Sequence, residues 1–168
     1  KIKFPVRSST ITSGMVGFSV RTGVNNDLTY LYAGDLQGAM WKLDFTKTNI
    51  GSWTLDTLST FKNSGTALPM FVAKDSAGTP NLQPISMEPA LVFGQNRNII
   101  VAFGTGKFLE VSDIASPYKA QSVYALLDNN GSTVDAVSTP EAAIAGRGRL
   151  KGATTVTAST ITIDAFNW

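Results

Sequence analysis

The sequence predicts an all-β protein, and three observations favour this fold class. Of the 168 residues, 43% are hydrophobic and 15% are charged, a balance that suits one domain with a sizeable core. Short runs of β-branched and aromatic residues alternate with turn residues along the chain, which is typical of strands joined by tight turns. Helical signals are almost absent. Only residues 139–148, with Pro140 near the start and Gly146 as a stop, suggest a short helix.

The strand pattern recurs about eleven times, at spacings of roughly 8–14 residues, as expected for a sandwich or a propeller. The expected strands cover residues 15–20, 28–34, 38–45, 52–58, 68–74, the part of 85–94 after Pro89, 98–104, 106–112, 121–128, 151–158 and 159–166. The last two are expected to pair as a hairpin. Asn130-Gly131, just after Asp128, gives the strongest short hairpin signal of the chain.

A degenerate internal sequence repeat favours a propeller over a sandwich. Residues 31–44 and residues 101–113 each contain an apolar strand that ends in Gly, a turn through a second Gly, and a further apolar segment that ends in Asp. Repetition of such a unit among short strands fits radial repetition. We therefore expect a partial β-propeller of about three four-stranded blades.

The segment Asp35-Leu36-Gln37-Gly38 predicts a four-residue turn. The Asp35 side chain can accept a hydrogen bond from the backbone two residues on, Gly38 can adopt positive φ, and Gly34 allows a close backbone approach. After the turn, the two-residue period places Trp41 on one face of a strand and Lys42 on the other. We expect Trp41 to pack between neighbouring blades, with its indole N–H bonded to an acceptor.

We interpret three further Asp residues and a glycine-containing loop as structural features rather than as binding sites. Asp44, Asp113 and Asp128 are expected to cap turns and strand ends. Gly104-Thr105-Gly106-Lys107 resembles a phosphate-binding loop only superficially, because its glycines are one residue apart and a strand-like run follows, so we expect Gly104 and Gly106 to belong to a hairpin.

Composition excludes several kinds of chemistry. The chain contains no Cys and no His, so a disulfide, a Ser-His-Asp triad and a His-based zinc site are excluded within it. The carboxylates are scattered, and no pair suggests acid–base hydrolysis. We therefore expect no enzyme activity. Two oxygen-rich loops leave calcium binding open as a minor alternative: Asp128, Asn130, Ser132 and Asp135, and residues 25–27.

The charge pattern gives little indication of a nucleic-acid partner. The net charge is +2 and the pI is near 8.9, with Lys and Arg spread along the chain. Arg147, Arg149 and Lys151 form the nearest basic cluster, which we interpret as a solvated loop, with anion binding as the alternative. No apolar run approaches the roughly 20 residues of a transmembrane helix. Both ends look cut from a longer chain, so a targeting signal is not expected here.

Four blocks together resemble one protein family. They are YAGDLQGAMWKLD (32–44), QPISMEPALVFG (83–94), NIIVAFGTGKFLEVSD (98–113) and QSVYALLDNNG (121–131). Their sequence, order and spacing resemble the C-terminal propeller of the PilC/PilY-type adhesins, which are associated with the tip of type IV pili. The tail, residues 148–168, resembles the approach to that propeller's closing strand.

The resemblance implies a modified propeller related to quinoprotein dehydrogenases. It implies that residues 1–168 are a single fragment of a larger C-terminal propeller domain, without the N-terminal domain and the final closing strands. It further implies export to the outer membrane, cell surface or pilus tip, and a non-enzymatic role in pilus assembly, retraction control and surface adhesion. The implied partners are minor pilins and host or abiotic surfaces.

The resemblance also bears on calcium. Many members of the family carry a calcium loop just before the block at 32–44, but this chain has Arg21, Gly23, Asn25 and Thr29 at the ligand positions. We therefore expect no cofactor.

Two alternatives come from other functional classes. The pattern GD-x-x-G-x-x-W also resembles repeats of quinone-cofactor dehydrogenases, so a fragment of such an enzyme remains open. A propeller scaffold that binds glycans or a partner subunit is the second alternative, with Tyr118 and Trp168 as the aromatic residues that would support it.

Overall fold

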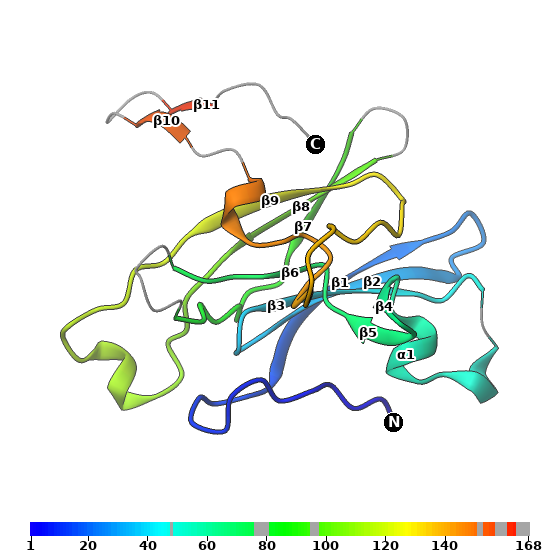
Figure 1. The fold of residues 1–168 in the computed structure, drawn as a ribbon, viewed down its shortest axis with the longest axis horizontal. Coiled ribbons are helices and arrows are strands. Elements are labelled where there is room, and N and C mark those ends of the chain that lie inside the picture. Colours follow the sequence, from blue (N-terminus) through cyan, green and yellow to red (C-terminus); the bar gives the residue numbers. More distant parts are fainter. Residues whose placement is uncertain (48, 76–80, 95–97, 151–152, 157–160, 164–168) are drawn as a thin grey trace.

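The fold is that of an all-β protein with little helix, as predicted. The computed structural model describes residues 1–47, 49–75, 81–94, 98–150, 153–156 and 161–163, the last two ranges as backbone only. The strands are β1 (Met15–Thr22), β2 (Leu28–Asp35), β3 (Ala39–Asp44), β4 (Phe61–Asn63), β5 (Thr66–Leu68), β6 (Phe71–Val72), β7 (Ala90–Phe93), β8 (Ile99–Gly104), β9 (Val123–Asp128), β10 (Ala153–Val156) and β11 (Ile161–Ile163) (Figure 1). The helical turns are η1 (Ile50–Ser52), α1 (Leu55–Leu58), η3 (Val111–Ile114) and η4 (Arg147–Arg149).

The strands form four antiparallel sheets. The largest has the order β1-β2-β3-β6, and the second has the order β7-β8-β9. Two hairpins, β4-β5 and β10-β11, complete the described strands. The strands are thus distributed over sheets of four, three, two and two rather than evenly in fours.

The two larger sheets pack face to face and enclose the main core. Most of their contact is apolar, and the ring of Phe71 from the first sheet packs at a tilt against the ring of Tyr124 from the second, with a centroid distance of 5.0 Å. The buried residues of this cluster are Tyr32, Met40, Phe61, Met70, Phe71, Ala73, Ile85, Ile99, Val101, Phe103, Tyr124, Leu126, Ala143 and Ile144. Removing this much apolar surface from water is the dominant stabilising contribution to such a fold.

Trp41 belongs to a second, smaller core cluster. It is fully buried there with Ala39, Ala67, Val72 and Ala142, on the face of β3 opposite to Lys42. The ring of Phe4 contacts it edge-on at 5.3 Å. Trp41 thus packs between its own sheet and a cover formed by the N-terminal segment and the β4-β5 hairpin, and its placement between propeller blades stays a prediction.

Two expected strands do not form, and a helical turn takes up part of each segment. In residues 52–58, the alternating pattern predicted a strand, but Thr54 and Thr57 form a reciprocal capping box that begins α1. In residues 106–112, the Asp113 side chain accepts hydrogen bonds from the backbone N–H groups of Leu109 and Glu110. These bonds favour η3 over an extended strand.

Three turn predictions also need correction. No α-helix forms in residues 139–148, where only the short turn η4 begins. Asn130 has positive φ, as a hairpin turn would need, but residues 131–146 form no strand, so the predicted hairpin is absent there. Gly104 ends β8 and Gly106 forms a parallel bridge with Ile85, so these glycines do not form a hairpin either.

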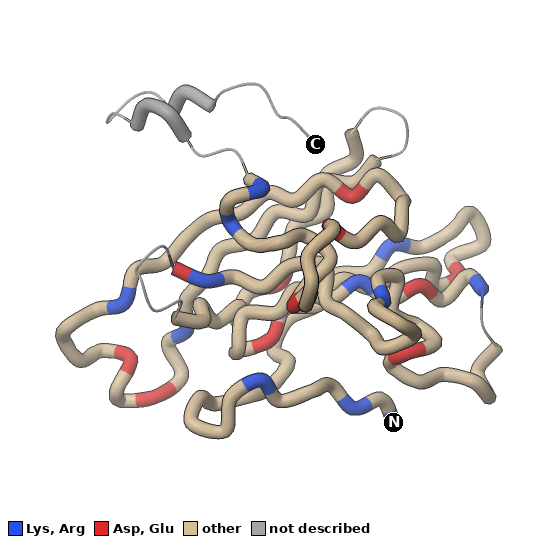
Figure 2. Tube along the Cα trace, in the orientation of Figure 1, with Lys and Arg blue, Asp and Glu red and all other residues tan. Residues whose placement is uncertain are grey.

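Charged residues are distributed over the whole chain. Among the residues that the structure describes, Figure 2 shows basic and acidic positions interspersed, without a stripe of one sign. Within the part of the chain that the structure describes, no helix is long and apolar enough to cross a membrane.

Candidate functional site

The turn after β2 is fixed by the Asp35 carboxylate. Its Oδ1 accepts hydrogen bonds from the backbone N–H groups of Gln37 and Ala39 at 2.9 and 2.8 Å, and its Oδ2 accepts one from the Trp41 indole at 3.3 Å. The turn and the indole acceptor are therefore both as predicted. Burial raises the pKa of Asp35, while the hydrogen bonds from Ala39, Trp41 and Gln37 oppose that shift.

Gln37, which the sequence did not single out, fastens the N-terminal segment to this turn. Its Oε1 accepts hydrogen bonds from the backbone of Arg7 and Ser8, and its Nε2 donates to the carbonyls of Ser8 and Ile11. The side chain is buried, and every one of its amide bonding positions is used for structure.

Gly34 and Gly38 are required because the segment 83–86 passes against them. A Cβ at Gly34 would lie 2.2 Å from Cγ2 of Ile85. At Gly38, φ is +85°, and a Cβ would lie 2.8 Å from the carbonyl oxygen of Gln83. Both expectations for these glycines are met.

The same segment joins the two Gly-containing motifs. The N–H of Ile85 donates to the carbonyl of Asp35, and the N–H of Gly106 donates to the carbonyl of Pro84. Residues 83–86 thus connect the two motifs with similar sequences, the one that contains Gly34 and the one that contains Gly106. The site residues near Gly34 and those near Gly106 form one structural unit.

A buried ion pair connects the two larger sheets. The Nζ of Lys42, from β3, lies 2.8 Å from Oδ1 and 2.6 Å from Oδ2 of Asp128, at the end of β9. The Tyr32 hydroxyl donates to Oδ2 at 2.5 Å. Burial and the adjacent Asp128 carboxylate raise the pKa of Tyr32, so the phenol remains a donor.

Asp128 keeps its predicted role as a turn residue as well. Its Oδ1 accepts a hydrogen bond from the backbone N–H of Asn130 at 2.9 Å. Asp44 similarly caps the end of β3, because its Oδ1 accepts from the backbone N–H of Thr46. Among the described residues, no group of three or more acidic, His or Cys side chains could hold a metal ion.

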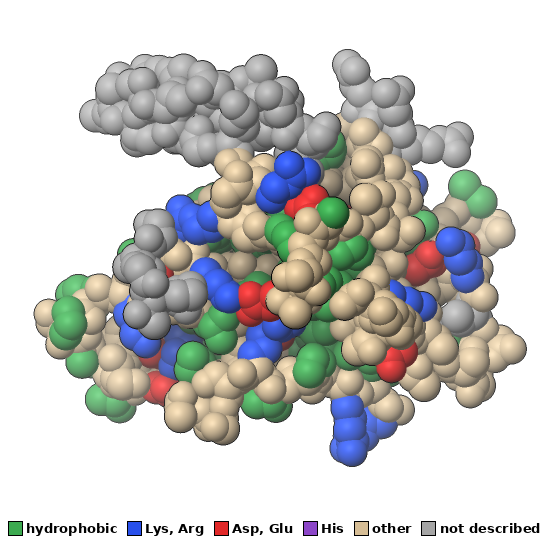
Figure 3. All heavy atoms as spheres, in the orientation of Figure 1, with side chains coloured by type: hydrophobic (Ala, Val, Ile, Leu, Met, Phe, Trp, Pro, Cys, Tyr) green, Lys and Arg blue, Asp and Glu red, His purple; other side chains and the backbone are tan. Residues whose placement is uncertain are grey.

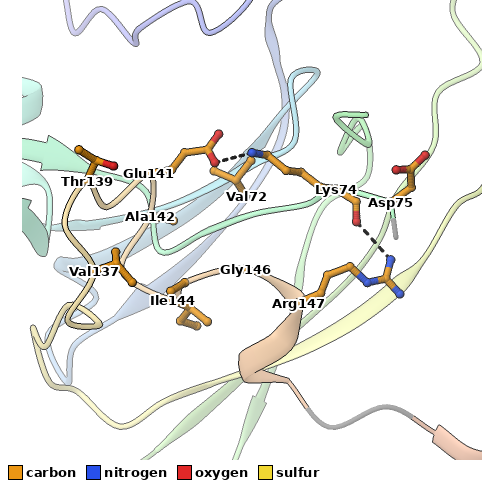
Figure 4. A pocket seen from close by; sticks show the side chains of 11 residues that line it. Val72, Lys74, Asp75, Val137, Thr139, Glu141, Ala142, Ile144, Gly146 and Arg147 are labelled. Atoms are coloured by element: carbon orange, nitrogen blue, oxygen red, sulfur yellow. Dashed lines mark hydrogen bonds and ion pairs between the residues drawn. The ribbon is translucent and has the colours of Figure 1, made fainter. Parts of the chain in front are cut away.

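A cleft of about 490 Å³ opens beside the two larger sheets (Figure 4). Val72, Val137 and Ile144 give it an apolar part, and its rim carries both charges. The Nζ of Lys74 pairs with Glu141 across the rim at 2.5 Å. Nη1 of Arg147 donates to the Lys74 carbonyl at 3.2 Å and to the Tyr124 hydroxyl at 3.2 Å. The rim groups therefore hold the 137–147 segment against β6.

A loop at the far left of Figure 1, which we call the projecting loop (residues 107–118), exposes large apolar side chains. They are Phe108, Leu109, Val111, Ile114 and Tyr118, and the exposed fraction of the Val111 side chain reaches 86%. Figure 3 shows hydrophobic side chains on the lobe at the same end of the molecule. A group of exposed apolar side chains on a protein surface is typical of a contact site.

Charged groups stiffen the base of the projecting loop. The Nζ of Lys107 lies 2.8 Å from Glu110 and 2.9 Å from Asp113. The Thr12 hydroxyl donates to Glu110 at 2.6 Å. Backbone N–H donors, first that of Leu109, and the Lys107 ammonium lower the pKa of Asp113 to about 2. The loop therefore presents its apolar side chains from a fixed base.

Comparison with known proteins identifies the family. The family model described as the PilY1 beta-propeller domain matches residues 9–162. The chain belongs to the PilY1 β-propeller family. It is 35% identical, over 71% of its length, to the type IV pilus biogenesis factor PilY1 of Pseudomonas aeruginosa strain PAO1, and 34% identical, over 66%, to that of strain UCBPP-PA14.

A solved structure supports the PilY1 assignment. The crystal structure of the Pseudomonas aeruginosa PilY1 C-terminal domain matches 87% of this chain with a TM-score of 0.59 and 27% sequence identity. The match covers 31% of that domain, and the chain spans about 12% of the length of the PAO1 relative. The resemblance seen in the four sequence blocks is therefore confirmed at the level of family and fold.

The residues that sequence reasoning missed are those that pair over long distances. Lys42 was placed on a strand face and Tyr32 only within an expected strand, and nothing in their spacing indicated Asp128 as a partner. Gln83 was quoted only within a family block. Its side chain bonds the carbonyl of Ala120 and the Tyr124 hydroxyl. Burying an unpaired Lys is costly. The position of Lys42 between Trp41 and Leu43 was therefore the one sequence feature that could have indicated a buried acidic partner.

Proposed function

We propose that this chain is a non-enzymatic part of a type IV pilus-associated protein that supports pilus assembly and retraction control and takes part in surface adhesion. Membership in the PilY1 β-propeller family is the observation that carries this proposal. The relatives are named type IV pilus biogenesis factors, so the homology supports a pilus-associated role. Pilus assembly, retraction control and surface adhesion are the specific roles that we propose.

The proposal places the protein on the exported side of the cell, at the outer membrane, the cell surface or the pilus tip. Its partners are minor pilins and host or abiotic surfaces. It includes no cofactor, since Asp128, the acid of the oxygen-rich loop, already faces the Lys42 ammonium, and that pairing opposes a cation at the same oxygens.

The projecting loop is the part that we assign to surface contact. Its five exposed apolar side chains lie within eleven residues, and convex loops held by a rigid scaffold commonly carry binding functions. The ion pairs of Lys107 hold the loop in place before contact, which reduces the entropy lost on binding.

Deletion of this region from the full-length gene tests the overall proposal. We expect fewer pili, less twitching motility and weaker attachment to a glass or epithelial surface. Unchanged piliation, motility and attachment together would overturn the proposal.

A narrower variant tests the projecting loop. Phe108→Ser combined with Val111→Ser removes two exposed apolar side chains and is expected to reduce attachment several-fold while the number of pili stays unchanged. Val24→Ser is the matched control, because Val24 is fully exposed in a different loop. Equal attachment by both variants would exclude the loop as the contact element.

A further inference from the structure

Two adjoining clefts form a polar groove at one end of the largest sheet. One cleft, of about 400 Å³, lies between the start of β2, the end of β3, β4 and the segment after β9. The other, of about 620 Å³, lies at the turn between β1 and β2. Tyr30 and Asn130 line both clefts, so the two adjoin. We call them together the polar groove; its lining includes Arg21, Tyr30, Lys47, Lys62 and Ser132.

The strand register gathers cationic side chains around Tyr30. Arg21 lies opposite Tyr30 in the β1-β2 pair, and Asp44 lies opposite Tyr30 in the β2-β3 pair. The Nζ of Lys42 lies 4.7 Å from the centroid of the Tyr30 ring, and Cζ of Arg21 lies 5.7 Å from it. These cations take up ring surface on which a nucleic-acid base or the apolar face of a sugar would otherwise stack.

Two cations of the polar groove have no carboxylate partner in the part of the chain that the structure describes. The buried pair described above neutralises Lys42, and the Nζ of Lys47 lies 4.0 Å from Asp44. Lys62 and Arg21, in contrast, form no ion pair with a described residue. The groove therefore has an excess of positive charge, although the net charge of the whole chain is only +2. Such an excess in a cleft attracts an anionic ligand.

Hydroxyl groups accompany these cations. The hydroxyls of Tyr30 and Ser132 line the polar groove and make no hydrogen bond with any residue that the structure describes. Each can both donate and accept a hydrogen bond. They complement a ligand that carries hydroxyl groups of its own, whereas a nucleic acid would need aromatic surfaces for its bases. The groove therefore favours a ligand that combines negative charge with many hydroxyls.

We propose that the polar groove binds an acidic polysaccharide. Sugar carboxylates contact Lys62 and Arg21, and sugar hydroxyls contact Tyr30 and Ser132. A guanidinium can bind a carboxylate through two parallel hydrogen bonds. Both clefts lie within the range of roughly 300–1,000 Å³ that is usual for small-ligand sites, so neighbouring sugar units of one chain occupy the two clefts. The groove lies at the end of the molecule opposite to the projecting loop (Figure 1).

Binding of purified full-length protein to polygalacturonate, a polymer of carboxylated sugars, tests this proposal. Biolayer interferometry in calcium-free buffer gives the Kd, and dextran serves as the uncharged control polymer. We expect polygalacturonate to bind and dextran not to bind, with an affinity that falls as the salt concentration rises. Absence of binding to polygalacturonate, or equal binding to dextran, would overturn the proposal.

Single substitutions assign the binding to the polar groove. Lys62→Gln and Arg21→Gln are each expected to raise the Kd about tenfold, because each removes a charge-assisted hydrogen bond. Arg21→Lys keeps the charge and should retain most of the affinity. Lys119→Gln is the matched control, because it removes one exposed charge outside the groove. Lys62 is exposed too, so the comparison of Lys62→Gln with Lys119→Gln decides even where Arg21→Gln lowers stability. Equal Kd values for these two variants would contradict the proposal.

Single-stranded DNA distinguishes a polysaccharide site from a general site for polyanions. We expect it to bind more weakly than polygalacturonate at the same salt concentration. Equally tight binding of DNA that Lys62→Gln also weakens would show that the groove recognises charge alone, and the assignment to a polysaccharide would be wrong. The inference goes beyond the proposed role in pili, and because it is tested on purified protein, the piliation and motility results neither support nor contradict it.

Discussion

The Nζ of Lys42 lies 2.6 Å from Oδ2 of Asp128, and the exposed fraction of each side chain is 1%. The two residues are 86 positions apart and come from different sheets. A charge pair removed from water recovers its desolvation cost only when its geometry is good and the remaining polar atoms are bonded. Tyr32 and the backbone of Asn130 supply those bonds here.

Lys42→Met is expected to lower the free energy of unfolding by about 3–5 kcal/mol, because it leaves Asp128 buried without its counter-charge. Urea denaturation of this variant against Lys62→Met, which removes an exposed ammonium from β4, gives the matched comparison. The double variant Lys42→Met/Asp128→Asn should recover part of the loss. A Lys42→Met protein as stable as Lys62→Met would show that the pair contributes nothing.

Tyr32→Phe should have a smaller effect than Lys42→Met, since Asp128 keeps its ion pair. Loss of one buried hydrogen bond to a charged group is expected to cost about 1.5–3 kcal/mol. Tyr118→Phe serves as the control, because the Tyr118 ring is exposed in the projecting loop. Urea denaturation midpoints are measured for the Tyr32→Phe and Tyr118→Phe variants. Equal midpoints for the two variants would contradict the assigned role of the Tyr32 hydroxyl.

The interactions of Asp35 could be predicted from the sequence, whereas those of Lys42 could not. The Asp35 turn depends on neighbours within six positions, so local residue preferences contain the information. The Lys42 contact depends on how two sheets face each other, which no periodicity specifies. The strand pattern predicted the all-β fold, and the turn motif predicted a close backbone approach at Gly34, but neither indicated that Ile85 is the residue against it.

Local polar chemistry explains the strands that were predicted and are absent. Residues 52–58 alternate as a strand would, but the side chains of Thr54 and Thr57 offer the backbone a capping box. Residues 106–112 are apolar enough for a strand, but the Asp113 carboxylate binds two N–H groups that a sheet would need. In both cases short-range side-chain bonds compete successfully with pairing.

Gly38→Ala is expected to destabilise the protein more than Gly65→Ala. Both glycines have positive φ, +85° and +87°, so the conformational cost of about 1–2 kcal/mol is shared. Only at Gly38 would the new Cβ meet backbone, 2.7 Å from the carbonyl oxygen of Ala73, whereas nothing lies within 4 Å at Gly65. The extra crowding is expected to cost about 1–3 kcal/mol. Thermal denaturation of the two variants measures the difference. Equal losses of stability would mean that positive φ alone, and not the contact with Ala73, requires glycine at position 38.

The projecting loop is expected to loosen at low pH and at very high pH. The pKa of Asp113 is lowered to about 2 and that of Glu110 is lowered, so their contribution is complete above the ordinary carboxyl range and is lost as the pH falls through the lowered values. The pKa of Lys107 is raised, first by its hydrogen bond to Glu110. Its contribution is therefore complete below the ordinary Lys value of 10.5 and is lost as the pH rises above it.

Amide hydrogen exchange, corrected for intrinsic rates, checks this pH dependence. We expect the amides of Leu109 and Glu110 to be protected near pH 6 and to lose protection near pH 2, with the amides of β8 as the internal reference. Asp113→Asn should reduce protection of the same two amides at pH 6, because the neutral side chain is a weaker acceptor and loses the Lys107 ion pair. Protection that is unchanged by both acid and Asp113→Asn would mean that the apolar contacts of the loop, rather than its charged base, hold it in place.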